Sequence, residues 1–314
     1  MEPTPGAPTI ACPANVTVRG VPGGTQPVTY PAPVVTGGAA PVNVTCTPGS
    51  GAPFTVGTTG VACTAVDAKS RQAQCSFSVT LTPLLLSVTK FLAFGDSLTE
   101  GEDGRTARLG FGPGFIDPTG TYPILLQASL NAEYPGQSIV VLNRGISGEL
   151  IEKGAVRLPD VLAADRPGAL LLLDGYNNLL NNCQSSPGSA TCSAAMDLVV
   201  GKLRECIRTA QTPPYGVKYT FVSTLTPPGP FVSGKDKRIP LTVITQTNTR
   251  IAAAVRTEGA ILVDPFPVFV GHESEYVADD GLHLRRAGYQ ALADTFFAVI
   301  KNTVASTPGF GAIH

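Results

Sequence analysis

A serine and a histidine of this chain lie in sequence contexts that suit nucleophilic catalysis. Ser97 belongs to the string FGDSLT at residues 94–99, which follows a run of strand-forming residues and opens a glycine-rich loop. A serine hydroxyl is a weak nucleophile at neutral pH, but an imidazole that accepts its proton makes attack on an ester carbonyl feasible. His283 can supply that imidazole, and Asp280 can hydrogen-bond its other ring nitrogen from the same loop. These residues predict ester hydrolysis by a serine–histidine–aspartate triad through an acyl-enzyme intermediate.

The serine and the histidine each have a competing interpretation. Serine is favoured at helix N-caps, so Ser97 taken alone could simply cap the element that follows it. The chain has three histidines, which narrows the choice of base. His272 lies in a polar loop and His314 is the last residue, where chains tend to fray, so His283 is the preferred base.

The carboxylate partner of the histidine has rivals. Spacing favours Asp280, but Asp279 is its neighbour, and Asp264 follows the last predicted strand, where several α/β hydrolases place their acid. Asp96 is interpreted as a residue that orders its turn through hydrogen bonds and not as a second catalytic acid. Asn143 could serve the edge of the active site, but a turn-shaping role fits its position equally well.

Alternating strands and helices must bring these distant residues together. Short β-branched, apolar or aromatic runs predict five strands, at residues 88–94, 139–142, 169–173, 218–222 and 260–263. Segments with helical spacing of apolar residues lie between them, such as 196–207 and 251–255. This alternation predicts a doubly wound α/β layer with a mostly parallel sheet. Because active residues gather outside the carboxyl ends of such strands, Ser97, residues 147–148 and residues 176–177 should converge on one edge.

Four short strings, in the same order along the chain, resemble the sequence blocks of the SGNH/GDSL hydrolases. They are GDSL at 95–98, NRGISGE at 143–149, GYNN at 175–178 and DGLH at 280–283. The resemblance covers roughly residues 88–305. It implies a three-layer α/β/α, flavodoxin-like domain with a mostly parallel five-stranded sheet, and a triad of Ser97, Asp280 and His283.

The resemblance also implies an oxyanion hole, a set of donors that stabilises the negative charge formed during attack. Its members would be the backbone N–H groups of Ser97 and Gly148 and the side-chain amide of Asn177. One position departs from the family, which often has an aspartate after the third-block asparagine, where this chain has Asn178. We interpret that acid as a neighbour that shapes the loop, so its replacement concerns local geometry more than catalysis.

Residues 1–83 form a different kind of segment, rich in Pro, Gly, Thr and Val and poor in charge. Short alternating strands, such as 15–18 and 76–81, and frequent turn signals predict a small all-β sandwich. Strings at 11–15, 45–48, 56–67 and 75–79 resemble the HYR (hyalin repeat) module, an immunoglobulin-like domain, over about residues 7–82. The resemblance implies adhesion or spacing without catalytic residues. A spacer that stabilises or projects the enzyme and a domain that binds an extracellular ligand both remain open.

Cysteine usage indicates an oxidising compartment. The first domain holds four cysteines, which allow three pairings: Cys12, Cys46, Cys63 and Cys75. We favour Cys46 with Cys63 and Cys12 with Cys75, because Cys63 and Cys75 face each other across one predicted hairpin and direct cross-hairpin bridges are unusual.

The remaining three cysteines lie in the second domain. Cys183 and Cys192 flank a polar loop and are expected to close it by a disulfide, whereas Cys206 lies on an apolar helix face and is expected to be a buried, inert thiol. A metal site is the alternative for a cysteine pair, but no histidine cluster accompanies any pair at ligand spacing. We therefore expect neither a metal nor a cofactor.

Composition limits the remaining function classes. The 314 residues suffice for two domains, expected at 1–83 and 84–314, and a formal net charge of −1 argues against nucleic acid as a partner. No run is long enough for a membrane span, and residues 84–88 are interpreted as a linker. The chain begins without a signal region, and the disulfide count leads us to expect that a secretion signal has been removed. The protein is therefore expected to be secreted or on the cell surface.

The leading interpretation is a secreted serine hydrolase acting on a carboxylic ester, either a short acyl ester or an acetyl group on carbohydrate. The alternative is a cell-surface adhesion or binding protein whose hydrolase domain is vestigial. Within the enzyme class, lipase, acetylesterase, thioesterase and acyltransferase remain open. The partly aromatic run at residues 109–115 could wall an acyl pocket or simply pack as a loop.

Overall fold

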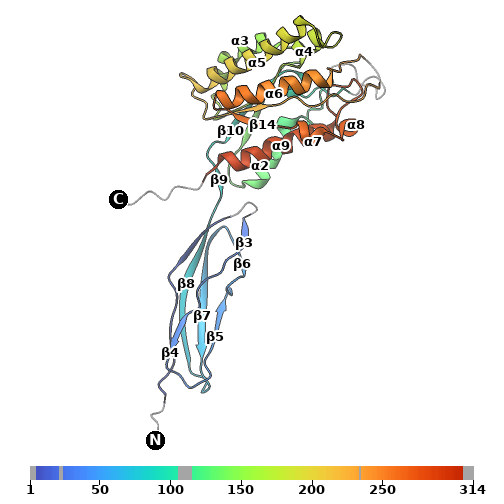
Figure 1. The fold of residues 1–314 in the computed structure, drawn as a ribbon. Helices are drawn as coiled ribbons and strands as arrows, with labels where there is room; N and C mark the ends of the chain where they lie inside the picture. Colours follow the sequence, from blue (N-terminus) through green and yellow to red (C-terminus); the bar gives the residue numbers. More distant parts are fainter. Residues whose placement is uncertain (1–4, 21–23, 105–114, 233–234, 307–314) are drawn as a thin grey trace. The chain divides into compact units, whose positions relative to one another are not determined.

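The computed structural model describes residues 5–20, 24–104, 115–232 and 235–306, and Figure 1 shows how their elements are arranged. The chain divides into two compact units, one that runs to Leu85 and a second one formed by Leu86–Ala305. Each unit has its own buried apolar side chains, and each is described separately below.

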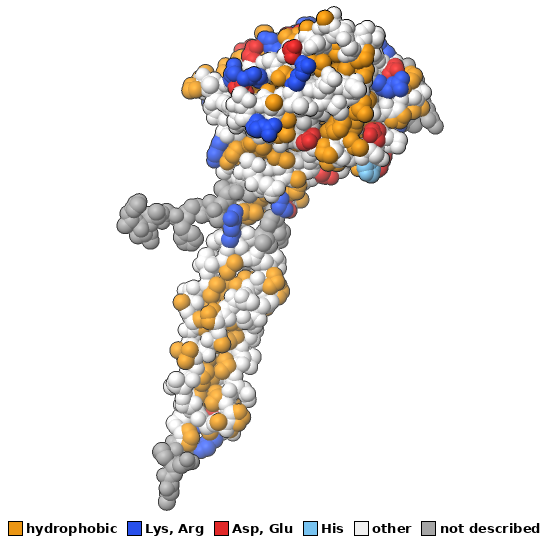
Figure 2. Space-filling model, viewed as in Figure 1, with side chains coloured by type: hydrophobic (Ala, Val, Ile, Leu, Met, Phe, Trp, Pro, Cys, Tyr) orange, Lys and Arg blue, Asp and Glu red, His pale blue; other side chains and the backbone are white. Residues whose placement is uncertain are grey.

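The first unit is all β. A four-stranded sheet has the order β2-β8-β7-β5, and two further sheets pair β1 with β4 and β3 with β6. The strands are β1 (Thr9–Ala11), β2 (Val16–Arg19), β3 (Thr25–Pro27), β4 (Val34–Thr36), β5 (Asn43–Thr47), β6 (Pro53–Thr55), β7 (Gly57–Val66) and β8 (Gln72–Thr82). In β7 and β8 the inward side chains alternate with outward ones, as expected of strands with one buried face. Figure 2 shows few charged side chains on the visible face of this unit.

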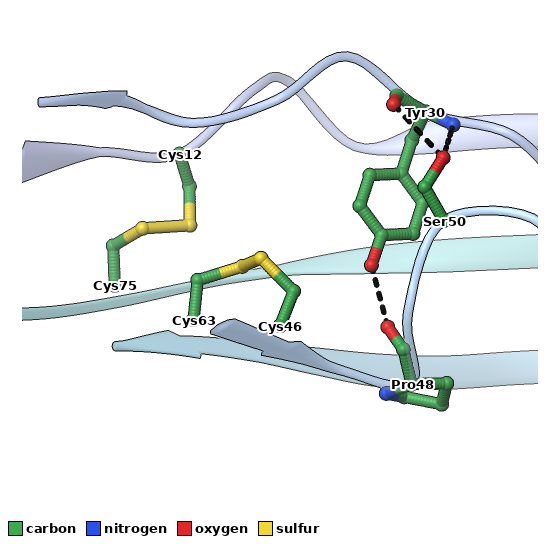
Figure 3. The surroundings of a disulfide bond; sticks show 7 residues. All are labelled: Cys12, Tyr30, Cys46, Pro48, Ser50, Cys63 and Cys75. Carbon is green, nitrogen blue, oxygen red and sulfur yellow. Dashed lines mark hydrogen bonds between the residues drawn. A yellow bond between two sulfur atoms is a disulfide. The ribbon is translucent and has the colours of Figure 1, made fainter. Parts of the chain in front are cut away.

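The core of the first unit is small and aromatic. The ring of Tyr30 meets that of Phe77 edge to face at 4.9 Å, and the Tyr30 hydroxyl donates to the carbonyl of Pro48 (Figure 3). The β7–β8 turn is held by Asp67, whose buried carboxylate accepts from the backbone of Ala39 and pairs with Arg71 at 2.7 Å. These interactions fix the loops that enclose the core.

Two disulfides cross-link this unit, Cys12–Cys75 and Cys46–Cys63 (Figure 3). This is the pairing favoured from the sequence, and Cys63 and Cys75, which face each other across the β7–β8 hairpin, are not bridged to each other. Cys46 lies directly opposite Cys63 on the neighbouring antiparallel strands β5 and β7, just as Cys63 lies opposite Cys75 on β7 and β8. A direct cross-strand bridge is therefore present, between two strands that are not joined by one hairpin turn.

The second unit is a three-layer α/β/α domain. Its parallel five-stranded sheet has the order β11-β10-β12-β13-β14, the order of a doubly wound fold with its switch point beside β10. The strands are β10 (Lys90–Gly95), β11 (Val140–Gly145), β12 (Ala169–Leu173), β13 (Tyr219–Ser223) and β14 (Ile261–Val263). The central strand β12 is buried at every position, which explains its uninterrupted apolar sequence.

Helices cover both faces of this sheet (Figure 1). On one side α2 packs against α9, and on the other α5 packs against α3, α4 and α6. The helices are α1 (Ser97–Glu100), α2 (Tyr122–Glu133), α3 (Ile151–Asp165), α4 (Tyr176–Cys183), α5 (Ala190–Gln211), α6 (Leu241–Thr257), α7 (Phe266–Phe269), α8 (Glu273–Tyr276) and α9 (Arg286–Val304). Two short strands, β9 (Leu85–Leu86) and β15 (Ala305–Ser306), complete the described elements; β9 falls within the segment expected as a linker.

The third disulfide joins Cys183 at the end of α4 to Cys192 in the first turn of α5. Cys206 is a free and buried thiol on α5, and burial raises its pKa to about 12. None of the helices in the described part of the chain combines the length and the hydrophobicity that a membrane span needs.

Candidate active site

Ser97 is the first residue of α1 and lies two residues beyond Gly95, where strand β10 ends. A side chain at Gly95 would overlap the carbonyl group of Leu173 on β12, so only glycine fits this crossing point. Asp96 is the N-cap of α1, and its carboxylate accepts from the backbone of Leu98 at 3.1 Å. The serine is thus held at the carboxyl edge of the sheet, and Asp96 orders the turn as expected.

Ser97, His283 and Asp280 form one chain of hydrogen bonds. The hydroxyl Oγ of Ser97 lies 2.8 Å from Nε2 of His283, and Nδ1 of the same ring lies 2.6 Å from Oδ2 of Asp280. The other carboxylate oxygen of Asp280 accepts from the backbone N–H groups of Leu282 and His283, both at 3.0 Å. The loop between α8 and α9 therefore presents acid and base together, and all three side chains are buried.

The hydrogen bonds decide the charge of Asp280. Burial alone would raise the pKa of this carboxyl. The hydrogen bond and the charge of His283, together with the hydrogen bonds from two backbone N–H groups, outweigh burial, so the pKa of Asp280 lies below its ordinary value. An ionised Asp280 can hold the imidazole in one orientation and stabilise it when it gains a proton.

The end of β11 at Gly145 and the tight turn at residues 146–149 approach α1. The N–H of Ile146 donates to the carbonyl of Gly95, and the N–H of Ser147 donates to the carboxylate of Glu100 at 2.6 Å. Gly148 follows with a positive φ of 77° and is exposed. Asn177, in the first turn of α4, donates from its side-chain amide to the carbonyl of Glu149 at 3.0 Å. The structure thus brings the second and third sequence blocks together beside the first.

An ion pair between Glu149 and Arg157 supports the turn that follows β11. Glu149 binds Arg157 of α3 through two hydrogen bonds, of 3.0 and 2.6 Å, and the guanidinium lies 4.1 Å above the ring of Phe94. Asn143 also shapes the turn, since its side chain accepts from the N–H of Gly145 and donates to the carbonyl of Glu100. Of the two roles left open for Asn143, these contacts fit the turn-shaping one.

Asn178, which replaces the family's acid, links helix α4 to the start of α3. It is buried, its carbonyl oxygen accepts from the N–H of Ile151 at 3.0 Å, and its amide donates to Glu152 at 2.6 Å. Ile151 is the first residue of α3, so Asn178 satisfies a helix N–H that has no partner within the helix.

The rival residues are engaged elsewhere. Asp279 pairs with Arg285 at 2.8 Å, and Asp264 accepts from the hydroxyl of Thr224. His272 is exposed and lies 3.4 Å from Glu275. His314 and residues 109–114 of the aromatic loop lie outside the described residues.

Two charged residues that the sequence did not single out also contact the triad. Glu102 lies 3.4 Å from Nε2 of His283, and Lys237 lies 3.4 Å from Nδ1 of the same ring. Neither lies at a strand end within a recognisable motif, and their positions follow only from tertiary packing.

Two further carboxyl groups near this site, those of Asp96 and Asp174, are buried. Burial raises the pKa of Asp96 to about 6, although N–H groups of Leu98 and Tyr176 and the charge of His283 favour its ionised form. Burial also raises the pKa of Asp174 well above its ordinary value, and one of its oxygens has no hydrogen-bond partner. At the site itself, a hydroxyl, an imidazole and a carboxylate are joined by hydrogen bonds. Among the described residues, no group of three histidine, cysteine or acidic side chains is placed to hold a metal ion.

Comparison with protein families gives two matches. The model of the GDSL-like Lipase/Acylhydrolase family matches residues 93–291, which is more than half of the chain, and that of the HYR domain matches residues 4–81. No curated protein sequence matches the chain.

Solved structures of similar fold cover the second unit. They include the α/β hydrolase LAE5 from the metagenome of Lake Arreo, Spain, at 22% identity and a TM-score of 0.53, covering 69% of this chain and 96% of that one. A catalytic mutant of the acetylxylan esterase Axe2 from Geobacillus stearothermophilus is 21% identical with a TM-score of 0.52, and the match covers 69% of this chain and 95% of that one. A lipase/acylhydrolase from Enterococcus faecalis is 20% identical with a TM-score of 0.52, and the match covers 70% of this chain and 99% of that one. At these identities the likeness shows the fold.

Proposed function

The chain belongs to the GDSL-like lipase/acylhydrolase family and is a carboxylic ester hydrolase, and from this premise we propose that Ser97, His283 and Asp280 are its catalytic triad. The observation that carries the proposal is the buried hydrogen-bond chain from hydroxyl to imidazole to carboxylate, at 2.8 and 2.6 Å. This unbroken series of hydrogen bonds favours a working enzyme over the alternative of a binding protein with a vestigial hydrolase domain.

The proposed reaction has two halves. In the first, Oγ of Ser97 attacks the ester carbonyl while Nε2 of His283 accepts the hydroxyl proton. The tetrahedral intermediate collapses as the imidazolium returns that proton to the leaving alcohol, which leaves an acyl group on Ser97. In the second half, a water molecule gives a proton to His283 and attacks the acyl carbon. The acid product leaves, and Ser97 regains its proton.

The oxyanion of each tetrahedral intermediate is proposed to accept from the backbone N–H groups of Ser97 and Gly148 and from the amide of Asn177. The link from Asn177 to Glu149 supports this role, because it holds the amide against the turn that carries Gly148. A preset donor of this kind typically contributes about 2.7–4 kcal/mol to transition-state stabilisation.

The substrate is proposed to be a short acyl ester or an acetyl group on carbohydrate. Acetylated xylan belongs in the test panel because one protein of similar fold is an acetylxylan esterase. Three disulfides and the HYR domain support a secreted or cell-surface location, where disulfides persist. The HYR domain is proposed to act there as a spacer or to bind an extracellular ligand.

The proposal is tested with p-nitrophenyl acetate, with p-nitrophenyl esters of longer acyl chains and with acetylated xylan. The wild type is compared with Ser97→Ala and with a matched control, Ser193→Ala, at an exposed position of α5. We expect Ser97→Ala to lose hydrolysis of every ester that the wild type cleaves and Ser193→Ala to keep it. Equal rates for the wild type and Ser97→Ala would remove the proposal.

A further inference from the structure

A pair of opposite charges lies against the imidazole of His283. Glu102 and Lys237 bind each other at 3.2 Å. The free carboxylate oxygen of Glu102 lies 3.4 Å from Nε2, while the ammonium of Lys237 lies 3.4 Å from Nδ1 and 3.6 Å from the carboxylate of Asp280. The pair therefore spans the ring from the nitrogen that faces Ser97 to the nitrogen that faces Asp280.

The backbone ties each member of this pair to a different part of the triad. The N–H of Glu102 donates to the carbonyl of Ser97 at 3.0 Å, and its carbonyl accepts from the hydroxyl of Tyr289 at 2.7 Å. The N–H of Lys237 donates to the carbonyl of Asp280 at 2.9 Å. The ion pair thus links the segment that carries the nucleophile to the loop that carries the acid and the base.

The charges of the pair act on the imidazole in opposite directions. The carboxylate of Glu102 favours the imidazolium that forms when Ser97 loses its proton, and the ammonium of Lys237 disfavours it. A single charge at such distances typically moves the pKa of a neighbour by about 1–3 units. Both side chains are largely removed from solvent, with exposed fractions of 10% for Glu102 and 25% for Lys237, which limits screening.

We propose that Glu102 and Lys237 are a positioning pair for this site: their ion pair holds the ring of His283 in line with Ser97, and their opposite charges together set its affinity for a proton. The proposal rests on the proposed function, because it gives His283 the role of base. Neither residue touches the reacting atoms of a substrate in this scheme, so each acts through the histidine.

Other charged groups also face the histidine and must stay constant in the test. Asp280 comes from its own loop, and Asp96, from the turn before α1, acts on His283 through its charge. Asp103 lies beside the loop through a backbone bridge to Leu284. None of these groups is changed in the variants below, so differences between variants report the pair alone.

The test compares Glu102→Gln, Lys237→Met and the double variant in the full chain. The matched controls are Lys202→Met and Glu205→Gln, which make the same charge changes in an ion pair of 2.7 Å on α5. Lys202 is 28% exposed, close to the 25% of Lys237. Two readouts are followed: the pH profile of kcat/KM, and the NMR titration of the imidazole of His283, which is resolved readily because the chain has three histidines.

Opposite shifts are expected for the two single variants. Glu102→Gln should lower the pKa of His283 in both readouts by about one unit, and Lys237→Met should raise it by about one unit. The pKa of His283 in the double variant should lie between those of the two single variants, because the two charges act on the imidazole in opposite directions. The control variants should leave both readouts unchanged. If Lys237→Met does not fold, Lys237→Gln makes the same charge change.

Two outcomes overturn the proposal. Either both single variants leave the titration of His283 unchanged, or both move it in the same direction, as a purely structural role would. Failure of the proposed function is recognised separately, because Ser97→Ala would then hydrolyse esters as fast as the wild type. The NMR titration measures the effect of the pair on His283 even in that case.

Discussion

Acidification from about pH 7.5 to about pH 5 is expected to stabilise the hydrolase domain, because Asp96 is buried behind the nucleophile. Burial raises the pKa of Asp96 from the ordinary 3.8 to about 6 in the folded state. As the pH falls, the folded state binds a proton before the unfolded state does, so folding gains free energy. This gain is complete below the unfolded pKa and is lost as the pH rises through about 6.

The magnitude follows from these two pKa values. A folded value of about 6 against 3.8 adds about 1.4 kcal/mol to the free energy of unfolding between about pH 7.5 and about pH 5. Asp174 acts in the same direction, because burial raises its pKa as well. Carboxyls whose pKa is lowered, such as Asp165, Asp280 and Glu258, titrate below this pH range and leave the sign unchanged within it.

Urea unfolding followed by circular dichroism at the helical band measures this effect. Every helix in the described part of the chain lies between residues 97 and 304, so the helical signal reports the hydrolase domain. The wild type, Asp96→Asn and a control, Asp197→Asn, are compared at both pH values. Asp197 is 70% exposed, so its substitution should leave the pH dependence unchanged.

Titrating groups that do not interact with Asp96 contribute equally to both proteins and cancel in the comparison. Asp96→Asn should lose about 1.4 kcal/mol of the stabilisation that acidification gives the wild type. If Asp96→Asn keeps the whole stabilisation that acidification gives the wild type, then burial does not raise the pKa of Asp96.

Three further predictions concern the site and its supports. Asn177→Ala should lower kcat by about 10²–10³ with little change in the circular dichroism spectrum, and an unchanged kcat would exclude Asn177 as an oxyanion donor. Asn178→Ala should lower the free energy of unfolding by about 0.5–2 kcal/mol, because the first N–H of α3 loses its acceptor. Asn178→Asp keeps that acceptor but places a second carboxylate against Glu152, so it should not restore the stability. Replacing Cys183 and Cys192 by serine should lower the free energy of unfolding by about 3 kcal/mol, as measured with urea under oxidising conditions. A reductant should then cause no further loss of stability in α4 and α5.

The sheet could be predicted because its strands are buried on both faces. Residues 169–173 form β12 as predicted, since five apolar residues in a row have no solvent side to interrupt them. The prediction for β10 began two residues early, and β11 extends three residues beyond the predicted end at Leu142. Those extra residues, 143–145, pair with β10 although they are polar or small, so register with a neighbour determined the strand and hydrophobicity did not.

The candidate site was predictable where a residue stands at the end of a strand. Ser97, the turn at residues 146–149 and Asn177 all follow strands of one parallel sheet, so the topology alone brings them to one edge. Glu102 and Lys237 could not be found in this way, because they lie in loops about 135 residues apart and meet only through tertiary packing.

The most direct test of the central claim is covalent labelling of the full chain with a p-nitrophenyl alkylphosphonate, followed by peptide mass spectrometry. We expect one phosphonyl group per chain, on the peptide that contains Ser97, with loss of esterase activity in proportion to labelling. We also expect that His283→Gln labels much more slowly than the wild type. Labelling of a different residue in step with the loss of activity, or full hydrolysis by chains that carry the label on Ser97, would exclude Ser97 as the nucleophile.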